Sequence, residues 1–280
     1  MSILLNLIKS VMRLKPSFPH DPGPAQTVSY QGAPLPIPAM MEVPFDGGSA
    51  RFSTPNDMAA WRVSTLFTKE PGTIDWIGEF QEGEVLVDVG ANVGMYSIWA
   101  ALTRKVRVYA FEPESQNYAI LNHNIFMNQL SGHIVAYCAA LSDQAEFSLL
   151  NLGKFGAAGS CHAFGEKLNF QLQPFSPSFT QGAYSTTLDS LVEAGVMPCP
   201  NHIKIDVDGF EHKVMTGARR TVQNPTVRSV LIEINQSLNL HQQIVENLSA
   251  LGFRHDPSET ARAVRMEGTF KGVGNYVFRR

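Results

Sequence analysis

The segment VDVGANVG, residues 87–94, combines glycines with an acidic residue. It continues a short apolar run at 85–89 and precedes a helical pattern, so we expect a tight turn between a buried strand and a helix. Glycine permits such a turn and lets a ligand approach the backbone closely. The helix that follows offers free N–H groups and the positive end of its dipole. The segment therefore predicts a binding site for a carboxylate or a phosphate.

The spacing of this turn separates two classes of nucleotide cofactor. Gly90, Asn92 and Gly94 give the pattern G-x-N-x-G, which differs from the G-x-G-x-x-G of NAD-binding proteins. Asp88 stands at the very end of the strand, where it would repel a pyrophosphate and would suit the ammonium of a methionyl group. Both features favour S-adenosylmethionine over NAD.

Acidic residues also follow the next two predicted strands. Glu112 ends the second strand, 24 residues after Asp88. An acidic residue there can accept hydrogen bonds from both ribose hydroxyls, in either class of nucleotide. Asp143 follows Ala140 and Leu141, where the chain would cross the adenine edge. It either accepts a hydrogen bond from the adenine amino group or only caps a turn.

Three further ionisable residues, Asp206, Glu211 and His212, come at and after the end of the predicted strand at 203–207. Ligands of open α/β sheets bind outside the carboxyl ends of the strands. Methylation of an alcohol also needs a group that aligns the acceptor and removes its proton. We expect Asp206 to face the methyl group and its acceptor. His212 is either a base that works near neutral pH or a surface histidine, and Glu211 is either catalytic or an acid favoured by the helix dipole.

Carboxylates in this region also raise the question of a metal ion. Asp206, Asp208, Glu211 and Glu233 have the hard oxygen atoms that divalent cations prefer. Carboxylates at a strand edge have other uses, however, and the remaining histidines show no spacing typical of metal ligands. We therefore predict no metal site.

The elements that must position these residues alternate along the chain. Strands are predicted at 85–89, 106–111, 134–141, 146–151, 203–207, 227–234 and 275–278, and helices at 96–102, 115–127, 188–194, 211–219 and 240–251. Ser115 is the predicted N-cap of the second helix. This alternation predicts an α/β fold with a mostly parallel, seven-stranded, Rossmann-like sheet and helices on both faces. We expect the last strand to be antiparallel.

The chain is predicted to have three parts. Residues 1–40 form an amphipathic helix and a proline-rich arm, residues 41–84 a helical extension, and residues 85–280 the Rossmann-like domain. An insertion at 144–185 interrupts that domain, and insertions of this length are often lids or substrate-binding loops. The helix at 2–15 either contacts a membrane surface or, as we prefer, docks on its own domain or on a second subunit as a homodimer.

Composition excludes several classes of protein. The chain has 280 residues, 44% of them hydrophobic, and a net charge of −3, so it can bury a core but shows no basic stripe for nucleic acid. It has three cysteines and no CxxC pair, which argues against a disulfide framework or a zinc site. We therefore expect a cytoplasmic protein, which the helix at 2–15 would hold at a membrane surface if that helix binds membranes. No apolar segment is long enough to span a bilayer.

The chain resembles the FkbM family of methyltransferases from about residue 69 to 278. Four blocks carry the resemblance, VDVGANVGMYS (87–97), YAFEPESQNYAILNHN (109–124), AALSD (139–143), and TTLDSLVEAG (186–195) with HIKIDVDGFEHKVMTGA (202–218). The family implies a Rossmann-like class I methyltransferase fold, S-adenosylmethionine as the donor, and O-methylation of sugars or other natural products. Asp208 departs from the family pattern, which more often has glutamate there; the charge is kept and the side chain is one methylene shorter.

These observations together predict an S-adenosylmethionine-dependent methyltransferase that acts on a hydroxyl of a sugar, glycan or other small natural product. An NAD-dependent oxidoreductase and a non-catalytic nucleotide-binding scaffold are the alternatives. The predicted catalytic residues are Asp206, Glu211 and His212. The predicted cofactor-binding residues are Asp88, Gly90, Ala91, Asn92, Gly94, Tyr96, Ser97, Glu112, Pro113, Asn117, Ala140, Leu141, Asp143 and Asp206.

Overall fold

A computed structural model describes residues 39–280 of the chain. Its main sheet contains β3 (Val85–Val89), β4 (Arg107–Phe111), β5 (Ile134–Tyr137), β10 (His202–Ile205), β11 (Ser229–Asn235) and β12 (Val273–Arg279). The strand order is β12-β11-β10-β3-β4-β5, and every neighbouring pair is parallel except β11 and β12. The mostly parallel sheet and its antiparallel last strand are thus confirmed, with six strands where seven were expected.

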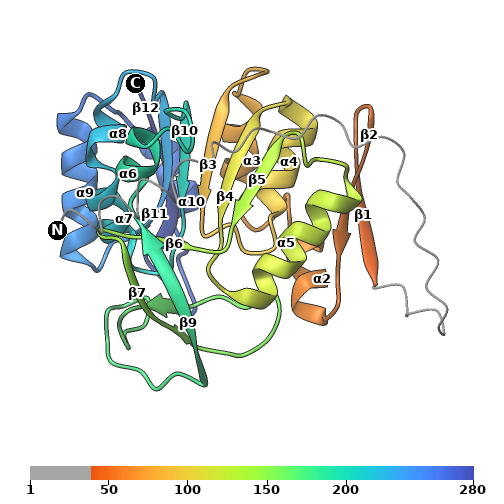
Figure 1. Cartoon of the computed structure of the whole chain (residues 1–280). Coiled ribbons are helices and arrows are strands. Elements are labelled where there is room, and N and C mark those ends of the chain that lie inside the picture. The colour runs from red at the N-terminus through yellow and green to blue at the C-terminus, as the bar shows by residue number, and fades with distance from the viewer. Residues whose placement is uncertain (1–38) are drawn as a thin grey trace.

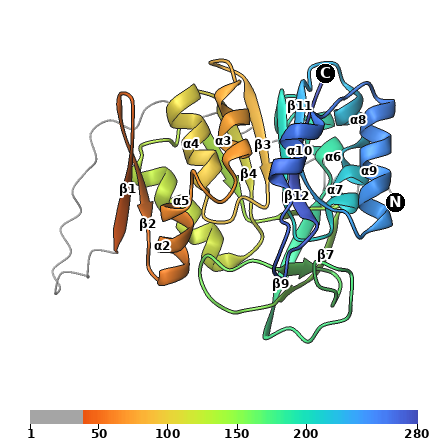
Figure 2. The ribbon, with the colours of Figure 1, turned by 180° about the vertical axis from the view of Figure 1, so that it is seen from behind.

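Helices cover both faces of this sheet, as predicted (Figures 1 and 2). One face carries α3 (Pro71–Gly78), α4 (Met95–Arg104) and α5 (Ser115–Met127), and the other α6 (Leu188–Glu193), α7 (Glu211–Gly217), α8 (Arg219–Gln223) and α9 (Asn239–Ala250). A last helix, α10 (Pro257–Ala263), lies against β12. Side chains alternate along β3, since Val85, Val87 and Val89 belong to one apolar cluster and Leu86 to the other. The two clusters therefore pack against opposite faces of the sheet.

The expected seventh strand forms, but it belongs to a different sheet. The strands β6 (Ala140–Leu141), β7 (Glu146–Leu152), β8 (His162–Phe164) and β9 (Phe179–Thr186) make a second sheet in the order β6-β9-β7-β8. The strand predicted at 134–141 is divided between the two sheets, because β5 ends at Tyr137 and β6 pairs with β9. The 144–185 insertion is therefore largely this second sheet, which Figure 1 shows below the main one.

The segment before the main sheet is only partly helical. Residues 40–53 form a hairpin of β1 (Met40–Phe45) and β2 (Gly48–Ser53), followed by α2 (Asp57–Ser64) and α3. The Asp46-Gly47 pair between the strands explains the difference, since Gly47 has a φ of 99° and this dipeptide is typical of two-residue hairpin turns. The hairpin packs along α5 at the edge of the molecule (Figure 1).

Two smaller expectations concern helix ends and membranes. The N-cap of α5 is Glu114 and not Ser115, because the Glu114 carboxylate accepts a hydrogen bond from the backbone N–H of Asn117 at 2.7 Å. Within residues 39–280, no helix combines the length and apolar character that crossing a bilayer requires. The amphipathic segment at 2–15 and nearly all of the proline-rich arm lie outside the described residues.

Strand order reverses between β3 and β10, and this is the point at which open α/β sheets bind ligands. The two strands approach so closely here that only glycine fits at position 90. A Cβ on Gly90 would lie 2.0 Å from the carbonyl oxygen of Asp206, and its φ is 78°. The glycine turn is therefore a packing requirement of the fold as well as an opening for a ligand.

Substitution of Gly90 by alanine is expected to destabilise the protein by about 2–5 kcal/mol, the combined cost of overpacking and of a left-handed alanine. Thermal unfolding measures it. Gly83→Ala is the matched control, because Gly83 has a φ of 82° but nothing within 4 Å of the added Cβ. The control should lose only the conformational part, about 1–2 kcal/mol. Equal losses in both variants would contradict the close approach of the two strands.

Candidate active site

A cavity of about 490 Å³ opens at the carboxyl ends of β3, β4 and β10, with residues of the second sheet on its far side. Eight of the predicted cofactor-binding residues line it, namely Gly90, Asn92, Glu112, Pro113, Asn117, Ala140, Leu141 and Asp206. Ala91 and Tyr96 line a smaller cavity that shares several residues with the first. We call them the central and the side cavity. The structure thus brings together most of the predicted cofactor site.

Four predicted residues line neither cavity. Asp88 is buried, and Ser97 donates a hydrogen bond to it at 2.6 Å. Gly94 is the N-cap of α4, with a φ of 81°. Asp143 is exposed and accepts a hydrogen bond from the Ser142 hydroxyl. A direct role of these four in cofactor binding stays a prediction.

Glu112 is the most deeply placed acid of the central cavity. Its Oε2 accepts a hydrogen bond from the Asn92 backbone N–H at 2.8 Å, and its Oε1 from the Glu114 N–H at 2.9 Å. Burial raises the pKa of Glu112 to about 7 despite these bonds. A carboxylate has about four lone-pair sites, so two remain for hydroxyl donors. Glu112 can therefore accept from a ribose, as its position at the end of β4 predicts.

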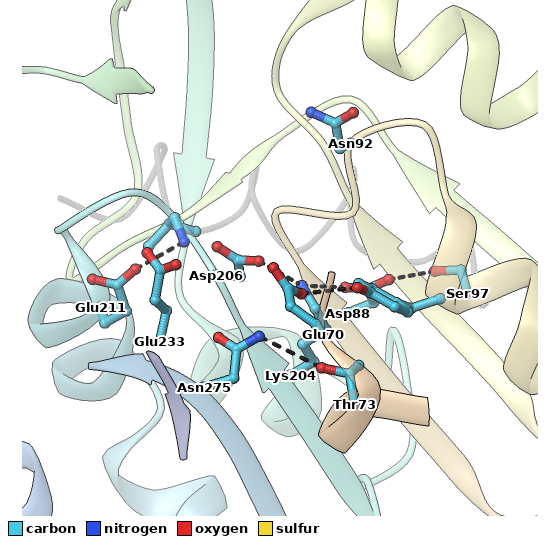
Figure 3. Close-up of polar contacts among 12 residues, drawn as sticks. Glu70, Thr73, Asp88, Asn92, Ser97, Lys204, Asp206, Glu211, Glu233 and Asn275 are labelled. Carbon is cyan, nitrogen blue, oxygen red and sulfur yellow. Dashed lines mark hydrogen bonds and ion pairs between the residues drawn. The ribbon is translucent and has the colours of Figure 1, made fainter. Parts of the chain in front are cut away.

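A buried lysine joins the two acids on the neighbouring strands β3 and β10. Lys204 Nζ lies 3.5 Å from Asp88 Oδ1 and 3.3 Å from Asp206 Oδ2, and the lysine is 2% exposed (Figure 3). Burial opposes the charge on Lys204, but Asp206 and Asp88 outweigh it and raise the pKa of the lysine. Burial alone would raise the pKa of Asp206, but the positive charges of Lys204 and then Lys69 outweigh it, so the pKa of Asp206 is lowered. Asp206 therefore presents a stable negative charge to the cavity.

The insertion is fastened over the central cavity by side chains of the glycine turn and α5. Asn92 and Asn117 both donate to the carbonyl oxygen of Gly159, at 2.6 and 3.1 Å. Asn117 also accepts from the Ala158 N–H at 2.7 Å. Asn92 has a φ of 51°, a conformation that asparagine tolerates better than most residues. Asn92 and Asn117 thus line the central cavity and also hold residues 158 and 159 of the insertion beside it.

Asp208 and Glu233 face the same cavity beside Asp206. Asp208 Oδ2 accepts from the backbone N–H of Cys161 at 2.6 Å, which ties it to the insertion. Burial and then Asp206 raise the pKa of Asp208 to about 6. The same two causes raise the pKa of Glu233 well above its usual value, and Arg265 pairs with it at 3.2 Å. Figure 3 shows Asp206 between Glu233 and the Glu70–Lys204 group.

Glu211, predicted as catalytic, is fully buried and lines neither cavity. Its Oε1 accepts from the Val207 N–H at 2.9 Å and its Oε2 from the Gly209 N–H at 3.0 Å. His241 Nε2 lies 3.1 Å from Oε2, while His241 Nδ1 accepts from the Asn235 N–H, so the ring proton lies on Nε2, toward Glu211. The structure thus gives Glu211 the position of a support for the turn that carries Asp206 and Asp208.

His212, the other predicted base, is half-buried on α7 and does not line the central cavity either. Burial and then His241 lower its pKa. Among residues 39–280, no group of three or more histidine, cysteine, aspartate and glutamate residues is arranged to hold a metal ion. The cysteines, all within this range, are free thiols. Of the three predicted catalytic residues, only Asp206 reaches the cavity.

The lining fits the chemistry of S-adenosylmethionine. Glu112 has acceptor positions for the ribose, Pro113 and Leu141 are apolar walls for an adenine, and Asp206 has a negative charge for an ammonium. The central cavity also has side chains that the sequence did not single out, above all Arg62, Lys69, Lys213, Arg265 and Phe270. Arg62 and Lys213 lie on α2 and α7, and the others lie in loops, where no strand-end rule points to them.

Comparisons with known proteins agree with this chemistry. The sequence model described as the methyltransferase FkbM domain matches residues 88–255. Hexuronic acid methyltransferase AglP of Haloferax volcanii is 25% identical over 243 residues, which cover 84% of this chain and 86% of that protein. The 31-O-demethyl-FK506 methyltransferase FkbM of Streptomyces tacrolimicus is 26% identical over 197 residues, covering 62% of this chain and 74% of the other.

Among solved structures, precorrin-6y C5,15-methyltransferase from Geobacter metallireducens aligns with a TM-score of 0.44 at 12% identity, over 77% of this chain and 90% of that one. The family match extends over more than half of the chain and includes the glycine turn, β4 and the turn after β10. It confirms the methyltransferase prediction over the oxidoreductase and scaffold alternatives. This chain belongs to the FkbM family of methyltransferases, and its methyl donor is S-adenosylmethionine.

Proposed function

We propose that this protein transfers the methyl group to a hydroxyl oxygen of a sugar, glycan or other small natural product. The two curated relatives are named for methylation of a hexuronic acid and of 31-O-demethyl-FK506, which are acceptors of these kinds. The observation that carries the proposal is the carboxylate of Asp208 beside Asp206 in the central cavity. An alcohol, unlike an amine, needs a base to take its proton during transfer.

Asp208 is the proposed base. Its pKa of about 6 leaves the carboxylate ionised at neutral pH. This pKa is also closer to the working pH than that of an ordinary aspartate, which suits a general base. The bound cofactor supplies an electrophilic methyl group on a sulfonium. Methylation of the acceptor oxygen would release the hydroxyl proton, and Asp208 would take up that proton. Because only Oδ2 accepts the Cys161 N–H, Oδ1 is available for that proton.

The rest of the cavity wall fits a polar acceptor with an apolar face. Phe164, Phe210 and Phe270 line it beside Lys213 and Arg265. Aromatic faces stack on the C–H faces of sugars and on apolar rings, while the cations bind acidic or hydroxyl oxygen atoms. A sugar or a polyketide-like alcohol can therefore place its apolar face on the aromatic rings and its oxygen atoms on the cations.

Methyl transfer from labelled S-adenosylmethionine to a panel of hexoses, hexuronic acids, glycans and macrolide alcohols tests the proposal. Mass spectrometry of the product should place the methyl group on oxygen. Matched amino sugars serve as the control, because they offer a nitrogen acceptor on the same ring. Preferential transfer to nitrogen, or none to any oxygen acceptor by protein that binds the donor, would overturn the proposal.

A further inference from the structure

The side cavity, of about 50 Å³, lies at the glycine turn next to the central cavity. It is lined by Arg62, Thr65, Lys69, Glu70, Gly90, Ala91, Asn92, Val93, Met95, Tyr96, Lys204 and Asp206. The two cavities adjoin, because both are lined by Arg62, Lys69, Gly90, Asn92 and Asp206. Two of the three cations of the side cavity, Arg62 and Lys69, precede the family-matched residues 88–255. Nothing in that match assigns them a role.

Charges of both signs meet in this small space. Asp206 contributes a carboxylate, which pairs with Lys204. Lys69, between α2 and α3, and Arg62, on α2, contribute positive charges. The N-terminal turn of α4 closes the cavity with Val93 and Met95, and a helix N-terminus favours an anion. An α-amino acid group has one ammonium and one carboxylate, and it matches this pair of opposite charges.

Lys69 is held in place by a buried network. Its Nζ lies 2.6 Å from Glu70 Oε1, the Tyr96 hydroxyl donates to Glu70 Oε2 at 2.8 Å, and Arg265 lies 3.2 Å from Oε1. Glu70 is 9% exposed, whereas the Lys69 side chain is 32% exposed, so the lysine reaches from a buried anchor toward the open cavity. Three hydrogens on Nζ allow it to keep Glu70 and donate to a second carboxylate.

We propose that Lys69 binds the carboxylate of the methionyl half of S-adenosylmethionine, with Arg62 beside it, while Asp206 accepts from the methionyl ammonium. The donor site is then completed by a residue outside the family-matched domain. This assignment concerns the donor alone and holds for any methyl acceptor.

Calorimetric titration with three ligands tests it on wild type and on Lys69→Met. S-adenosylhomocysteine has the whole methionyl group, its decarboxylated analogue S-adenosyl-3-thiopropylamine lacks only the carboxylate, and 5′-methylthioadenosine lacks both charged groups. Lys69→Met should weaken the binding of S-adenosylhomocysteine by about ten- to a hundredfold, which is the range expected for loss of one charge-assisted hydrogen bond. Affinities for the two ligands without a carboxylate should change by less than about threefold.

Lys105→Met is the matched control, because Lys105 also pairs with a glutamate, Glu82 at 3.9 Å, but lies outside both cavities. It should leave all three affinities unchanged, and Lys69→Arg should restore most of the affinity for S-adenosylhomocysteine. Thermal unfolding confirms that each variant is folded. Unchanged affinity for S-adenosylhomocysteine in Lys69→Met would overturn the proposal. An equal loss for all three ligands would overturn it too, because it would show a general disturbance of the turn.

Discussion

Replacement of Asp208 by asparagine is expected to lower kcat by about 10²–10⁴-fold, the usual contribution of a general base. The amide keeps the size of the side chain and can still accept the Cys161 N–H, so the insertion stays in place. It has no charge with which to take the hydroxyl proton. Affinity for S-adenosylhomocysteine, measured by calorimetry, should therefore stay within about threefold of wild type.

The pH profile gives the same prediction a second readout. The pKa of Asp208 is about 6, so the wild-type rate under saturating substrates should fall as the pH drops through this value and the carboxylate takes up a proton. The residual rate of the asparagine variant should not show this fall at low pH. Asp208→Glu is the matched control, because it keeps the carboxylate and introduces the residue more common in the family at this position. A glutamate variant as slow as the asparagine variant would argue against the base assignment.

Positions that depend on strand order could be predicted from the sequence alone. The glycine turn, Glu112 and Asp206 lie at the carboxyl ends of β3, β4 and β10, and the structure places all three on one cavity. Parallel strands present these ends at one edge, so residue type and strand position were sufficient. The helical pattern of the sequence likewise predicted the range of α5, residues 115–127.

Side-chain direction could not be predicted in the same way. Asp88 lies near the end of β3 as expected, yet it turns toward Ser97 and Lys204 and lines neither cavity. Glu211 begins α7 as expected, yet it turns back to the N–H groups of Val207 and Gly209. A buried acid takes whichever unpaired donors lie within reach, and these donors come from the three-dimensional packing. Sequence spacing does not show them.

The pairing of the second sheet was also beyond the sequence. The strand at 146–151 has a clear pattern, but its partner β9 begins 27 residues after β7 ends, past aromatic and proline-containing segments. Nothing local selects that partner over the main sheet. Since the insertion supplies Gly159 and Phe164 to the cavity, the wall that it forms was the part of the site that sequence reasoning described least well.

Substitution of Glu112 by alanine is expected to weaken S-adenosylmethionine binding by about 10²–10⁴-fold, because it removes two charge-assisted hydrogen bonds, each worth about 1.5–3 kcal/mol. The wild type should itself respond to pH. Burial raises the pKa of Glu112 to about 7, so the carboxyl is ionised above this pH and protonated below it. Ribose hydroxyls donate more strongly to the ionised form, and binding therefore lowers the pKa of Glu112 and releases a proton.

It follows that affinity should fall by up to about tenfold per pH unit as the pH drops below 7, until the pKa of the complex is reached. Calorimetry between pH 5.5 and 8 in buffers of different ionisation enthalpy measures both the affinity and the released proton. Glu112→Gln is the control, since its amide oxygen still accepts from a neighbouring N–H but does not titrate. Its affinity should be weak and independent of pH. A wild-type affinity that is flat across this range would show that the ribose does not bind to Glu112.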